Sequence, residues 1–61
     1  MSIRMLAREL YRAMKHVEQL EKELESMALG TPTRGDLQRR LLAARAEEKR
    51  IKAMVEGAKA D

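Results

Sequence analysis

Few side chains in this sequence could do chemistry. Its 61 residues include no cysteine and a single histidine, His16. One histidine cannot hold a metal ion alone, because protein sites for such ions need several ligands. No nucleophile with a nearby base is evident, and nothing indicates a pocket of catalytic size. We therefore predict a protein that is not an enzyme, with no catalytic residue, no metal site and no cofactor.

Glu48 stands where helical spacing calls for an apolar residue, and folding the chain as set out below brings it opposite His16. Two interpretations remain open. A half-buried hydrogen bond between His16 and Glu48 would fix the register of the helices, as a polar core residue can. Alternatively, a slight rotation of the second helix lets Glu48 reach solvent, and His16 is then a boundary residue.

A stripe of basic side chains lies near the N-terminus: Arg4, Arg8, Arg12 and Lys15, with Tyr11 beside it. Spacings of three and four residues place them on one outer helical face. Such a stripe could contact a polyanion or an acidic protein, but it is also typical of an ordinary solvated face at a net charge of +3. One tyrosine forms no platform for stacking bases. Without Trp or Phe to insert, we predict no membrane binding.

These side chains must be positioned by two long helices, expected at about residues 2–29 and 33–58. Apolar residues on both alternate at three and four positions, which is the pattern of a coiled-coil seam. The first helix carries Ile3, Leu6, Leu10, Ala13, Val17, Leu20, Leu24 and Met27. The second carries Leu37, Leu41, Ala44, Ile51, Val55 and Ala58, with Glu48 as the one fault.

A turn is expected at residues 30–35, where the only proline and two of the three glycines gather. Gly30 suits the end of a helix, and Thr31, Thr33 and Asp36 are candidate caps for the next one. A short loop between long helices makes them antiparallel neighbours. The predicted fold is all-α: an antiparallel two-helix coiled-coil hairpin.

Charge supports this pairing. Residues 17–30 have a net charge of −3 and residues 33–46 have a net charge of +3, and the hairpin lays these segments side by side. Complementary charges that flank a seam set the orientation of the helices more than they add stability.

Assembly is the remaining route to stability for so short a chain, since disulfides are excluded. We predict a homodimer in which two hairpins form a four-helix bundle, with the relative orientation of the hairpins left open. Apolar residues beside the seam are the possible dimer interface: Ala7, Met14, Ala28 and Met54. The high charge also allows an isolated monomer that is disordered.

The function expected from these features is a small structural or protein-interaction module that associates with itself and docks on another protein. The alternative is a nucleic-acid-binding protein that uses the basic stripe. No apolar run approaches the length of a membrane span and no secretory signal is visible, so we expect a cytoplasmic location.

Overall fold

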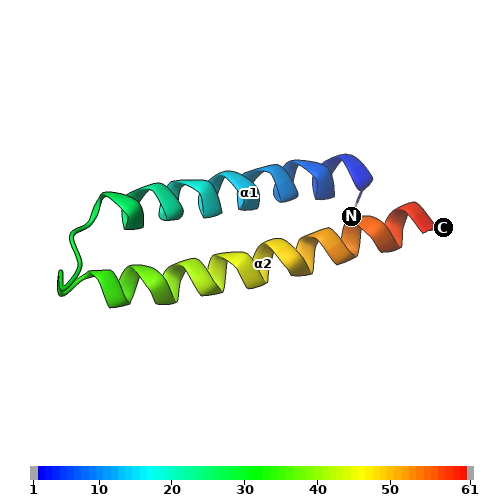
Figure 1. Ribbon diagram of the computed structural model, residues 1–61. Helices are drawn as coiled ribbons and strands as arrows, with labels where there is room; N and C mark the ends of the chain where they lie inside the picture. Colours follow the sequence, from blue (N-terminus) through cyan, green and yellow to red (C-terminus); the bar gives the residue numbers. More distant parts are fainter. Residues whose placement is uncertain (1, 61) are drawn as a thin grey trace.

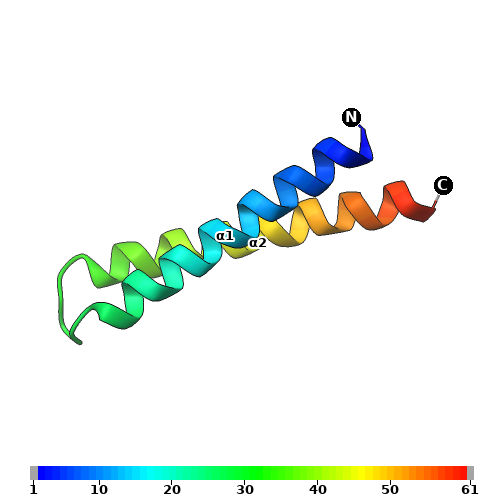
Figure 2. The same ribbon diagram turned by 90° about the horizontal axis from the view of Figure 1, so that it is seen from above.

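The computed structural model describes residues 2–60 as two helices, α1 (Ile3–Ser26) and α2 (Arg34–Ala60). They lie side by side and antiparallel, so that the start of α1 and the end of α2 share one end of the molecule (Figure 1). Seen from above, the two helices cross near mid-length (Figure 2). The rod measures 47 × 14 × 13 Å. The predicted antiparallel helical hairpin is confirmed.

Helix α1 begins next to Ser2, whose side-chain oxygen accepts a hydrogen bond from the Met5 amide at 3.2 Å. This is the usual way in which serine satisfies a free amide at a helix start. The helix ends at Ser26, earlier than the expected residue 29, because Met27 leaves it with an extended backbone. Gly30, expected to end the helix, instead serves the turn that follows, with φ of 90°.

Arg34 explains how α1 can end early. Its guanidinium donates to the carbonyl oxygens of Leu24 at 2.8 Å and Met27 at 3.0 Å. Carbonyls in the last turn of a helix have no partner within the helix and carry the negative end of its dipole. A cation from the next helix therefore satisfies them, and further turns of α1 are not needed.

The turn occupies residues 27–33, and α2 begins at Arg34. Two of the expected caps point back toward α1: the Thr31 hydroxyl donates to the Ala28 carbonyl at 2.7 Å, and the Thr33 hydroxyl to the Met27 sulfur at 3.9 Å. At its other end α2 continues through Gly57, where fraying was expected, as far as Ala60.

The core consists of two clusters along the interface of the helices. Val17, Leu20, Leu37 and Leu41 form the one nearer the turn, and Leu6, Ile51 and Val55 form the other. Six further seam residues are half-buried against these clusters: Leu10, Ala13, Leu24, Met27, Ala44 and Ala58. Ile3 stays 45% exposed at the open end. Between the clusters the seam holds Leu10, Ala13, Ala44 and Glu48, all of them half-buried, so the packed core is thinnest at its middle.

Candidate interaction site

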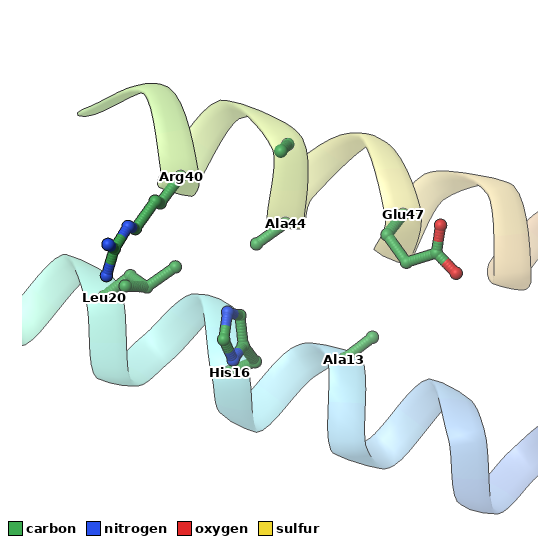
Figure 3. Close-up of a pocket in the computed structure, with 7 residues that line it drawn as sticks. Ala13, His16, Leu20, Arg40, Ala44 and Glu47 are labelled. Atoms are coloured by element: carbon green, nitrogen blue, oxygen red, sulfur yellow. The ribbon is translucent and has the colours of Figure 1, made fainter. Parts of the chain in front are cut away.

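A groove of about 490 Å³ opens on one side of this thin middle. Ala13, His16 and Leu20 of α1 line it, together with Arg40, Ala43, Ala44 and Glu47 of α2. Figure 3 shows six of these residues on the facing sides of the two helices. Alanines on both helices leave the space that larger side chains would fill. The groove therefore has apolar walls and a rim that carries charges of both signs.

His16 belongs to this rim and is exposed, whereas Glu48 is half-buried in the seam. Within residues 2–60, the two side chains form no hydrogen bond with each other. The acidic residue that shares the groove with His16 is Glu47, and Arg40 is the basic one. The structure thus makes His16 a boundary residue, and it lacks the register-fixing bond that the first interpretation required.

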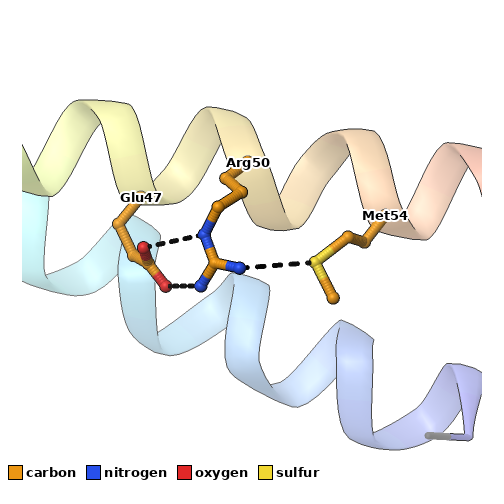
Figure 4. A network of polar contacts seen from close by, with 3 residues as sticks. All are labelled: Glu47, Arg50 and Met54. Atoms are coloured by element: carbon orange, nitrogen blue, oxygen red, sulfur yellow. Dashed lines mark hydrogen bonds and ion pairs between the residues drawn. The ribbon is translucent and has the colours of Figure 1, made fainter.

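Glu47 continues the charged rim along α2. Its carboxylate accepts two hydrogen bonds from the Arg50 guanidinium, the one from Nε at 3.0 Å, and Arg50 also reaches the Met54 sulfur at 3.9 Å (Figure 4). The bond from Arg50 lowers the pKa of Glu47, and Glu47 in turn raises the pKa of Arg50. Glu47 and Arg50 thus form an ion pair on the surface of α2.

The four residues expected in a dimer interface are Ala7, Met14, Ala28 and Met54. They lie on two different sides of the hairpin. The first three recur at seven-residue steps with Glu21, which pairs across the helices with Arg45 at 3.8 Å, on the side away from the groove. Met54 lies on the groove side, beside Arg50. Met14 and Met54 are 46% and 41% exposed, so both are available for contact. Because they lie on different sides, a single flat partner surface would not cover both.

Charge pairing between the helices is sparser than the sequence suggested. The pair of Glu21 with Arg45 is the one ion pair that joins α1 to α2 among the described residues. Asp36 is within reach of Arg39 and Arg40 on its own helix, at 3.8 and 3.3 Å. Arg34, the first residue of α2, contacts carbonyl oxygens instead of acids.

The basic stripe on α1 is half neutralised by acids on the same helix. Arg12 lies 3.5 Å from Glu9 and Lys15 lies 3.4 Å from Glu18, and Lys15 also stands 5.5 Å from the centre of the Tyr11 ring. Glu18, and after it Tyr11, raise the pKa of Lys15. Arg4 and Arg8 are exposed. Within residues 2–60 neither forms an ion pair, so these two are the members of the stripe most open to a polyanion.

Three groove residues, Arg40, Ala43 and Glu47, were not among the interface residues predicted from the sequence. They lie outside both the apolar seam and the basic stripe of α1. A signal was present: steps of three and four residues place them on one face of α2.

Neither helix, over the residues that the structure describes, has the length and apolar character that crossing a membrane requires. Over the same residues, no three His, Asp or Glu side chains gather as a metal ion would need. Comparison with protein-family models, with curated proteins and with solved structures finds no match.

Proposed function

We propose that this chain is a small structural and protein-interaction module: a coiled-coil hairpin that associates with a second copy of itself and docks on another protein. The observation that carries the proposal is its excess of surface. The hairpin exposes 4946 Å², against about 4,000 Å² for a compact monomer of its 7.0 kDa mass. The surplus of about 900 Å² is close to the roughly 800 Å² that each partner contributes to a standard interface.

The shape and the core support the same proposal. The radius of gyration is 14.2 Å, whereas a compact chain of this length has one of about 10–11 Å. Among residues 2–60, each of the seven buried side chains keeps 6–7% of its surface exposed, so none of them is sealed from water. Two helices present only one seam to each other, and a second hairpin laid on a flank would close the core as a four-helix bundle.

Light scattering coupled to gel filtration tests the self-association. We expect a particle of twice 7.0 kDa at micromolar concentrations. A particle of monomer mass at every concentration would contradict this half of the proposal. Docking on another protein is tested by affinity capture from native extract, with Ile51→Asp as control, because a charge in place of this buried residue unfolds the seam. Proteins captured equally by both chains would count against a specific partner.

Nucleic-acid binding is the second candidate, and it rests on the exposed pair Arg4 and Arg8. A gel-shift series in rising salt tests it, since phosphate contacts lose affinity steeply with salt. Replacing both arginines with glutamate should remove any shift that they cause. No shift at about 50 mM salt would exclude this candidate.

We further propose a cytoplasmic location, because a chain without cysteine fits a reducing compartment. Fractionation of cells that carry a tagged chain would check it.

A further inference from the structure

The groove side of α2 carries charges in an order that is its own complement. Asp36, Arg40, Ala43, Glu47 and Arg50 follow one another at steps of four, three, four and three residues, which places them in one stripe along the helix. Their charges run negative, positive, neutral, negative, positive. Read in the opposite direction, the order is positive, negative, neutral, positive, negative. Two copies of this stripe therefore match when they run antiparallel.

We propose that a second copy of the chain packs on the groove side of the hairpin, with α2 antiparallel to α2 of the other copy and a two-fold axis at Ala43. This proposal rests on the self-association proposed above and specifies its surface and orientation. Arg40 then faces Glu47 of the second copy, and Asp36 faces Arg50 of the second copy, each pair occurring twice. A parallel arrangement would set like charges against each other and is disfavoured.

The pairs that already exist within α2 strengthen the match. Asp36 lies 3.3 Å from Arg40, and Glu47 holds Arg50 with two hydrogen bonds. In the antiparallel dimer, the pair of Asp36 and Arg40 faces the pair of Glu47 and Arg50 of the second copy. The result is two clusters of four alternating charges, one on either side of the axis. Networks of this kind hold better than the isolated surface pairs from which they are made.

Small side chains at the centre of the stripe allow the helices to approach. Ala43 is exposed, and with Ala44 and Ala13 it borders the groove. No bulky group stands at the axis, so the charged pairs on either side can come within contact distance. The second copy would also cover the apolar groove walls, which include Leu20.

The occupant is a second copy because the stripe complements itself. A different protein would need charges of opposite sign at the same spacing along one of its helices. A second copy of this chain already carries them. The surplus surface of about 900 Å² also matches one standard interface.

Charge reversal with mixing tests the proposal. Arg40→Glu sets the introduced carboxylate against Glu47 of the second copy, and Glu47→Arg sets two cations together, so each variant should dimerise at least about tenfold more weakly than the wild type. Mixed one to one, the two variants restore every opposed pair. We expect the mixture to recover dimer mass by light scattering and each variant alone to remain largely monomeric at the same concentration. Any effect of a substitution on its own chain is the same in the variant alone and in the mixture. A difference in dimer mass between them therefore reports contacts between the copies.

A single introduced thiol provides a second measurement, because the chain has no cysteine of its own. Ala43→Cys should form a disulfide-linked dimer under mild oxidation, since the two-fold axis places position 43 of one copy next to position 43 of the other. Ala53→Cys is the control, because Ala53 is also exposed and lies on the same helix but outside the stripe.

The outcomes separate this proposal from the more general one. A wild-type chain that is monomeric at all concentrations contradicts self-association, and the proposed interface with it. A wild-type dimer that survives either charge reversal, or a mixture that does not recover, overturns the interface alone. Equal cross-linking at the two alanine positions overturns it as well.

Discussion

At the turn, one side chain joins the end of α1 to the start of α2. Arg34 is half-buried and donates to two carbonyl oxygens, those of Leu24 and Met27. Hydrogen bonds from a charged donor contribute more than neutral ones, and here the donor also meets the negative end of a helix dipole. We therefore expect Arg34 to stabilise the hairpin from outside the apolar seam.

We expect Arg34→Ala to lower the free energy of unfolding by about 1.5–3 kcal/mol, the range for hydrogen bonds to charged groups. Urea unfolding followed by circular dichroism measures this change. Arg39→Ala is the matched control, because Arg39 is 80% exposed and 3.8 Å from its partner, and it should cost less than about 0.5 kcal/mol. Equal losses in the two variants would show that Arg34 does not act as a cap.

The ion pair of Glu47 and Arg50 can be tested by measuring the pKa of Glu47. Arg50 lowers the pKa of Glu47, so we expect Arg50→Gln to raise that pKa toward the usual range of glutamate. NMR titration of the Glu47 carboxyl carbon gives the value directly. Because the pKa is lowered in the folded state, the pair stabilises the fold above the unfolded pKa and ceases to do so as the pH falls through the folded one. An unchanged titration in Arg50→Gln would mean that the pair does not persist in solution.

At the scale of the helices, two glycines with equally open surroundings should respond in opposite ways to alanine. Neither Gly57 nor Gly30 has an atom within 4 Å of an added Cβ, but Gly57 lies inside α2, whereas Gly30 has a positive φ of 90°. Gly57→Ala should stabilise the protein by up to about 0.5–1 kcal/mol, because alanine favours the helix. Gly30→Ala should destabilise it by about 1–2 kcal/mol. Melting temperatures compare them, and a loss in Gly57→Ala would indicate that α2 ends before it.

The helices were predictable because their seams repeat a local spacing that the fold obeys. Leu6, Leu20 and Ile51 are buried where that spacing places them. The end of α1 was misjudged because it depends on Arg34, which comes from the next helix and has no local signal in α1. The side of the hairpin taken by Met14 and Met54 was missed for a related reason. Antiparallel pairing sets equivalent flanks of the two seams on the same side, as the pair of Glu21 and Arg45 shows. Met14 follows a seam residue whereas Met54 precedes one, so these two flanks lie on opposite sides.

At the scale of the whole molecule, the hairpin is a thin rod whose two sides differ. The groove side carries charges of both signs in a self-complementary order. The other side holds Met14 and the exposed Leu42, with Glu21 and Arg45 between the helices. One side can therefore serve self-association while the other remains available to a different protein. This division reconciles the two activities that we propose for one short chain.

The last prediction follows from this difference between the sides. If two hairpins associate through the groove side, the melting temperature of the wild type rises with protein concentration, because association stabilises only the folded state. Met54→Lys adds a cation beside Arg50 on that side and should reduce the dependence on concentration. Met14→Lys adds the same charge at similar exposure on the other side and should leave it unchanged. Calorimetry over a hundredfold range of concentration measures all three slopes. The reverse order of the two lysine variants would move the dimer to the side of Met14.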